Sequence, residues 1–161
     1  VLAMITDINR NSLRLGAIHR IIHNTSLREV ESRTAGVTFR EIDPPYGDAE
    51  GVLENCNPHQ LLVTDGTSWR IASLNRGCSL DISALHFAIA PISEETSRQW
   101  SYSHAIPEAI CIAKRKQGVA FLLHPPSLPL VLKYAATGQL LPEKATSFWP
   151  KPLASMVVRT F

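Results

Sequence analysis

The apolar positions of this chain follow two spacings, one typical of strands and one typical of helices. Short apolar or alternating runs bounded by turn residues indicate β-strands, whereas apolar residues at every third or fourth position indicate an amphipathic helix. On this basis strands are expected at 1–5, 15–23, 37–42, 60–64, 68–74, 100–104, 119–123 and 156–160. Helices are expected at 27–34, 49–55, 79–89, 106–116 and 128–137.

Local start and stop signals support several of these elements. Ser26 followed by Glu29 forms a capping box, and Ser127 is a suitable N-cap for a later helix. Asp65-Gly66 lies between two strand patterns and indicates a hairpin, because that turn requires positive φ at its centre. Pro91 is expected to end the helix before it, since proline lacks the N–H that a helix uses.

The order of the elements differs between the two halves of the chain. The second half alternates helix and strand in the manner of β-α-β units, whereas the first half is typical of a meander with a hairpin. The predicted fold class is therefore mixed α/β (α+β) with a mixed sheet. The length of 161 residues suits a single domain, 1–161, or two closely packed sub-units, 1–78 and 79–161. The chain begins without Met inside a strand-like run, which favours the C-terminal portion of a longer protein whose upstream domain is a partner.

Charge and cysteine content argue against several classes of protein. The formal net charge of +2 is too small for nucleic-acid binding, which draws on many Lys and Arg side chains at once. Cys56, Cys78 and Cys111 are scattered without a C-x-x-C pair, so no zinc ribbon or thioredoxin-like site is expected. The longest apolar runs fall short of a bilayer span of about 20 residues. The sequence therefore predicts a cytoplasmic protein without a membrane or nucleic-acid partner.

Residues 141–152 form the segment with the most unusual chemistry. Three prolines stiffen it, which lowers the entropy cost of presenting its polar groups. The groups that could hold a phosphate or carboxylate are Lys144, Thr146, Ser147 and Lys151. The alternative is a solvated connection with Phe148 and Trp149 tucked into the core.

Arg20 and two histidines are further candidates for anion contacts. Arg20 lies in an apolar strand pattern and needs a partner, either an anion or an acid in the 43–50 loop. His104 comes just before a helix opened by proline, a junction that can aim a side chain into a cleft. His19 and His23 share one face of a strand about 13 Å apart, too far to share a metal.

Other polar residues have simpler interpretations. His86 is expected to pack beside a helix stripe, and His124 to be structural at the end of a buried strand. Asp43, Asp48 and Glu50 could supply oxygen ligands to Mg²⁺, although turn formation explains them better. The chain contains no G-x-x-x-x-G-K-[ST], G-x-G-x-x-G or G-x-S-x-G motif. No catalytic residue and no metal ligand is assigned.

Several segments together resemble a known family. They are Ile18-His19-Arg20-Ile21-Ile22, Ser79-Leu-Asp-Ile-Ser-Ala-Leu-His, Trp100-Ser-Tyr-Ser-His, Val119-Ala-Phe-Leu-Leu-His-Pro-Pro and Ala136-Thr-Gly-Gln-Leu-Leu-Pro-Glu-Lys-Ala-Thr-Ser-Phe-Trp-Pro-Lys-Pro-Leu. In order and spacing they resemble the end of the bacterial family called domain of unknown function 1015. The most specific part is Pro142-x-Lys144-x-Thr146-x-Phe148-x-Pro150-Lys151. Members of the family are usually longer, and their upstream half looks like the ParB and sulfiredoxin type and carries an Asp-Gly-His-His-Arg motif, which is absent here.

The resemblance implies a nucleotide-dependent enzyme acting on a small molecule. ParB-like relatives include nucleotide hydrolases and kinases of free serine, so ATP and Mg²⁺ are the implied cofactors and a nucleotide or phosphorylated small molecule the implied ligand. The chain departs from the family pattern at three places. Ala105 stands where an Asp commonly follows the histidine, Ala145 where a Ser commonly separates Lys and Thr, and Ala154-Ser155 replaces a small residue and Gly.

Two hypotheses therefore stand at the level of the sequence. In the first, the chain is the C-terminal domain of a kinase-like, amino-acid-directed or nucleotide-hydrolysing enzyme, and it contributes anion contacts. In the second, it is a non-catalytic scaffold that docks on the upstream domain or another protein through Trp100, Phe148 and Trp149.

Overall fold

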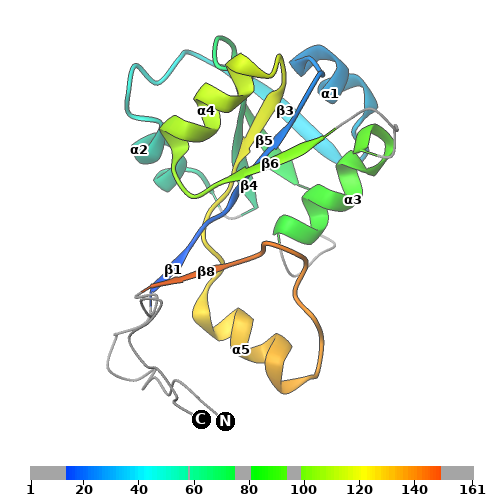
Figure 1. Cartoon of the computed structure of the whole chain (residues 1–161), viewed down its shortest axis with the longest axis vertical. Helices are drawn as coiled ribbons and strands as arrows, with labels where there is room; N and C mark the ends of the chain where they lie inside the picture. Colours follow the sequence, from blue (N-terminus) through cyan, green and yellow to red (C-terminus); the bar gives the residue numbers. More distant parts are fainter. Residues whose placement is uncertain (1–13, 58, 75–80, 94–98, 150–161) are drawn as a thin grey trace, which may run out of the picture.

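The fold is a six-stranded antiparallel sheet with helices on both faces and a small two-stranded ladder below it (Figure 1). The computed structural model describes residues 14–57, 59–74, 81–93 and 99–149. The strands are β1 Arg14–Gly16, β2 His19–Ile22, β3 Val37–Ile42, β4 Gln60–Thr64, β5 Trp69–Leu74, β6 Trp100–Ser103, β7 Val119–Leu122 and β8 Ser147–Trp149. The helices are α1 Leu27–Arg33, α2 Ala49–Glu54, α3 Asp81–Ser93, α4 Ile106–Arg115 and α5 Leu128–Ala136.

Strands from both halves of the chain interleave in the large sheet. Its order is β3-β5-β4-β7-β2-β6, and every pairing of its described strands is antiparallel. Because β6 and β7 both pair antiparallel with β2, they run in the same direction and form a split β-α-β unit through α4. The mixed α+β class is thus confirmed, with the expected β-α-β half present in this split form. The division into sub-units 1–78 and 79–161 stays a prediction.

Alternation along the strands divides the core into two layers. One cluster packs α1 and α3 on the first face through Val30, Leu85 and Ile89, and the other packs α2 and α4 on the second face through Leu53 and Ala113. Successive strand residues point to opposite faces, so Ile21 belongs to the α4 layer and Ile22 to the α1 and α3 layer. The same rule sends the side chains of the adjacent His19 and Arg20 to opposite faces.

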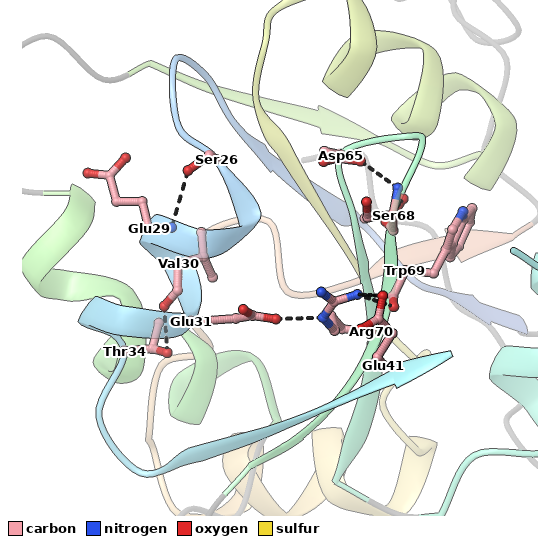
Figure 2. Close-up of polar contacts among 11 residues, drawn as sticks. Ser26, Glu29, Val30, Glu31, Thr34, Glu41, Asp65, Ser68, Trp69 and Arg70 are labelled. Atoms are coloured by element: carbon pink, nitrogen blue, oxygen red, sulfur yellow. Dashed lines mark hydrogen bonds and ion pairs between the residues drawn. The ribbon is translucent and has the colours of Figure 1, made fainter. Parts of the chain in front are cut away.

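Polar contacts at one end of the sheet fix α1 against the strands (Figure 2). The Ser26 hydroxyl accepts a hydrogen bond from the backbone N–H of Glu29, as the capping box predicts. Arg70 in β5 contacts Glu31 of α1 at 2.6 Å and Glu41 of β3 at 3.1 Å. The expected hairpin joins β4 to β5 by a four-residue loop, 65–68, in which Asp65 accepts N–H donors from the loop itself.

The structure corrects several expected boundaries. The strand expected at 15–23 is divided, because its first part pairs with β8 and its second part joins the large sheet. Helix α3 does not end at Pro91 but continues to Ser93. Proline in the last turn removes only its own N–H, and Ile92 is fully buried against the sheet. Strands expected at 1–5 and 156–160 lie outside the described residues. No helix within the described ranges is long and apolar enough to cross a bilayer.

Candidate functional site

His19 is a buried histidine whose protonation state is fixed by the sheet. Its side chain is 4 % exposed, and its Nδ1 accepts a hydrogen bond of 3.2 Å from the backbone N–H of Leu123. A ring nitrogen that accepts carries no proton, so the neutral ring holds its proton on Nε2. The Nε2–H group is the donor that remains on the ring, and His19 is one of the residues that line a cavity.

This cavity, called here the histidine cavity, has a volume of about 470 Å³. It lies between the start of β2, the segment after β7, helix α2 and the amino end of α4. Its polar side chains come from four parts of the chain: His19, Glu50, Glu54, His104 and His124. A concave site with a few converging polar groups is the usual form of a small-molecule site.

The amino end of α4 brings the positive end of a helix dipole to the histidine cavity, and the Glu108 carboxylate in its first turn offsets part of that charge. Its N-cap is Ala105, whose methyl group makes no capping hydrogen bond, so the first turn keeps its dipole uncapped by a side chain. Ser103 and Glu108 bond to each other at 2.6 Å, with the serine hydroxyl as donor. The exposed His104 lies beside this helix end and also lines the cavity. A helix end next to a histidine donor favours a negatively charged ligand.

Electrostatics keep His19 neutral. Burial, as the largest cause, and the nearby His104 and Arg20 together lower its pKa to about 4. An anion bound in the cavity would oppose all three effects. The carboxylates of Glu50 and Glu54, which α2 brings to the same cavity, are suited to a cationic group at its other side.

Arg20 points to the opposite face and does not reach the histidine cavity. It is fully buried, and it donates from Nη1 to the carbonyl of Ile18 and from Nη2 to the carbonyls of Glu143 and Lys144 at 2.9 and 3.0 Å. Its guanidinium carbon also lies 5.6 Å from the centroid of the Tyr102 ring. The expected pairing with an acid of the 43–50 loop is therefore replaced by carbonyl acceptors, which satisfy the same donors without a second charge.

The expectation for one further side chain is changed, and that for another is confirmed. His86 was expected only to pack, but its Nε2 accepts a hydrogen bond of 2.9 Å from Arg20. Asp48 caps α2 by accepting from the N–H of Gly51, as turn formation predicted. Among the described residues no group of three or more His, Cys, Asp or Glu side chains is placed to hold a metal. A role for Mg²⁺ stays a prediction.

The segment after α5 has a different form from the expected loop. Lys144 is exposed and has a φ of 53°. It does not line the histidine cavity. Thr146 is half-buried and Ser147 is buried at the start of β8, while Lys151 lies outside the described residues. Phe148 and Trp149 are 40 % and 63 % exposed rather than tucked into the core, because β8 pairs with β1 alone among the described strands. His19 and His104 therefore come together, while Arg20 and residues 144–147 lie apart from the histidine cavity; anion binding by the latter residues stays a prediction.

A second cavity, called here the apolar cavity, has a volume of about 400 Å³ and adjoins the first. Aliphatic and proline side chains form most of its wall, and His59 and Asp81 form a 2.5 Å pair there between Nδ1 and Oδ1. The two cavities share Leu123, His124 and Pro125. The Nε2 of His124 is buried without a hydrogen-bond partner among the described residues.

Reasoning from the sequence missed Glu54, His59 and Asp81 as parts of these cavities. They lie far apart in the chain, and only the packing of α2, β4 and α3 around the end of the sheet brings them near His19 or His124. His124 carried the available signal, because it follows a buried strand and precedes two prolines at a sheet end where ligands often bind.

The fold and site define a class: an antiparallel sheet covered by helices on both faces, with a histidine-lined cavity at the amino end of a helix. A solved structure with this fold is that of a mutant free serine kinase in complex with AMP, with a TM-score of 0.65 and 16 % sequence identity. The match covers 90 % of this chain and 57 % of that chain, so this chain spans little more than half of the matched protein. No family model and no curated protein matches the chain. At this identity the likeness is one of fold, and membership of the family suggested by the sequence stays a prediction.

Proposed function

We propose that this chain is the C-terminal part of a nucleotide-dependent enzyme of the amino-acid-kinase type, and that its histidine cavity holds the anionic group of a ligand. The fold supports this function, because the similar structure is a kinase of free serine solved with AMP. The family resemblance of the sequence points to the same class. The matched kinase is longer than this chain, so the upstream domain is proposed to supply the rest of the site.

The observation that carries the proposal is the fixed tautomer of His19 beside the amino end of α4. A buried donor on a ring that already lines a cavity needs no reorganisation to bind an anion. The helix end adds a favourable field for a phosphate or carboxylate. His104 adds a further ring at the rim of the same cavity.

The acidic residues of α2 favour an amino acid as the second ligand. Glu50 and Glu54 are one helical turn apart and line the same cavity as His19. An amino acid carries an ammonium group that these carboxylates can bind. In the kinase reaction a phosphoryl group would leave the nucleotide and bond to a hydroxyl oxygen of the substrate, whose proton passes to a base. With water as acceptor, the same transfer is nucleotide hydrolysis.

The test is a titration of the full chain with inorganic phosphate and with AMP. NMR monitors the resonances of the histidine rings during each titration. Phosphate should shift the ring signals of His19 and His104 and raise the pKa of His19. The variant His19→Asn should weaken phosphate binding roughly tenfold, whereas the matched variant His23→Asn should not. His23 is also buried at the end of β2, but its Nε2 bonds to Ser101 and it does not line the cavity. Absence of any shift with both ligands would refute this function.

Exposed aromatic residues support a second candidate, a docking domain. Phe148 and Trp149 lie on the small β1–β8 ladder with large exposed fractions. Exposed aromatic side chains are common where another protein surface packs. Trp149→Ser would then weaken association with the upstream domain while leaving phosphate binding intact.

A further inference from the structure

The apolar cavity is a compartment that lies directly beside the histidine cavity. Its walls come from the start of α3, the segment between β7 and α5, and the segment before β8. The apolar side chains that line it are Ile18, Ile82, Leu123, Leu130 and Ala145, together with Pro125 and Pro126. A compartment of this size and composition buries a flat, weakly polar group well.

Hydrogen bonds from a buried side chain and apolar packing hold one wall of the apolar cavity in place. Ala145 follows the two carbonyls, of Glu143 and Lys144, that accept hydrogen bonds from the buried Arg20. Ala145 and Ile82 also form a small buried cluster, against which Leu130 of α5 packs. A cavity whose walls are fixed in the absence of a ligand costs less entropy to fill.

Polar groups lie at only a few points of this cavity. The Asp81 carboxylate uses Oδ1 for His59, which leaves Oδ2 as an acceptor. The Ser127 hydroxyl makes no capping bond to α5, so it is available as a donor or an acceptor. An acceptor and a hydroxyl around apolar walls match the edge of a ring that carries an amino group and ring nitrogens.

The shared wall joins the two cavities into one elongated site. Leu123, His124 and Pro125 line both, so a molecule with an anionic end and a flat ring could occupy the two at once. The order of the groups follows from the chemistry of the walls. The anion belongs with His19 and the α4 end, and the ring belongs among the aliphatic and proline side chains.

We propose that the apolar cavity binds the amino-bearing purine base of the nucleotide whose phosphate occupies the histidine cavity. This inference rests on the proposed function, which supplies the nucleotide. It adds the compartment for the base and the residues that select it. Ile82, Leu130 and Pro125 contact the ring faces, while Asp81 accepts from the amino group.

The experiment uses adenosine, inorganic phosphate and AMP as separate probes of the full chain, measured by calorimetry. Leu130→Trp should fill the apolar cavity and weaken adenosine and AMP binding roughly tenfold, with phosphate binding unchanged. The control is Leu132→Trp on the same helix, because Leu132 is 42 % exposed and does not line the cavity. Inosine, which lacks the amino group, should bind more weakly than adenosine.

The outcomes separate this inference from the proposed function. AMP binding that survives in Leu130→Trp would overturn the base compartment and leave the proposed function standing. Adenosine binding without phosphate binding would keep the compartment and remove the proposed anion site. Failure of adenosine, phosphate and AMP alike to bind the unaltered protein would overturn both. Nuclear Overhauser effects between the purine protons and the methyl groups of Ile82 and Leu130 test the same point without any variant. Their absence in the AMP complex would count against the compartment.

Discussion

The Nε atom of Arg20 donates a hydrogen bond of 2.9 Å to Nε2 of His86, so a fully buried cation is held by a neutral imidazole. Burial and the positive charge of Arg20 both lower the pKa of His86, which keeps that ring unprotonated and able to accept. Burial also lowers the pKa of Arg20, to about 10, and the guanidinium stays charged at neutral pH. The pair thus joins β2 to α3 without a carboxylate.

Replacing Arg20 by lysine should destabilise the protein. An ammonium group cannot reproduce the planar fork that reaches His86 and the carbonyls of Glu143 and Lys144 at the same time. The buried carbonyl of Ile18 and the part-buried carbonyls of Glu143 and Lys144 would lose donors, so the expected loss is about 3 kcal/mol in the free energy of unfolding. Urea denaturation measures the loss, and hydrogen exchange of the Ala145 amide should become faster.

Arg28→Lys is the matched control for that change. Arg28 is exposed on α1, and an exposed substitution of this kind is expected to stay within about 0.5 kcal/mol. Equal stability of Arg20→Lys and Arg28→Lys would show that the buried contacts of Arg20 contribute nothing.

The stability of the protein should fall as the solution becomes mildly acidic. His19 has a folded pKa of about 4 against 6.5 in the unfolded chain, so between these values the unfolded state binds more protons. The free energy of unfolding therefore rises with pH across this window. The contribution of His19 to stability is lost as the pH falls from 6.5 to 4. The shift corresponds to roughly 3 kcal/mol. Burial lowers the pKa of His23 and of His86 as well, which adds to the same slope.

Denaturation at a series of pH values from 4 to 7 tests this dependence. The variant His19→Gln keeps a polar side chain but removes the titration, so its slope should be shallower than that of the unaltered protein. A slope that is identical in both proteins would contradict the assigned neutral state of His19.

The sequence predicted the helices and strands better than it predicted which strands pair with each other. Capping by Ser26 and the hairpin at Asp65-Gly66 depend on residues a few positions apart, so local chemistry was sufficient. The division of the 15–23 strand could not be read in this way, because the apolar pattern continues while the hydrogen-bonding partner changes from β8 to the large sheet.

The candidate site shows the same limit. His19, Arg20 and His104 were recognised as unusual, but period-two alternation alone did not tell which face of β2 would meet a cavity. Residues of α2 and α3 joined the site only through tertiary packing. The side chains of the 141–152 segment predicted an anion site. In the structure, two backbone carbonyls of this segment accept hydrogen bonds from Arg20.

Gly118 should tolerate no side chain. A Cβ atom built there would lie 2.1 Å from the carbonyl oxygen of Ile22, and backbone cannot move aside as a flexible side chain can. Gly118→Ala should therefore destabilise the protein by about 3 kcal/mol through overpacking between α4 and β2. Thermal unfolding measures the change. Gly16→Ala is the comparison, because its Cβ would meet Ser147 at an ordinary contact distance of 3.6 Å and should have little effect.

Ser147→Ala should increase stability and leave anion binding unchanged. The Ser147 side chain is 6 % exposed, and its hydroxyl has no hydrogen-bond partner among the described residues. A buried hydroxyl without a partner is unfavourable, so replacing it by a methyl hydrogen should raise the free energy of unfolding by about 1 kcal/mol. Urea denaturation and the phosphate titration are measured on the same variant. Weaker phosphate binding would instead show that this hydroxyl contacts the anion, as the sequence of the 141–152 segment suggests, and would move the anion site away from His19.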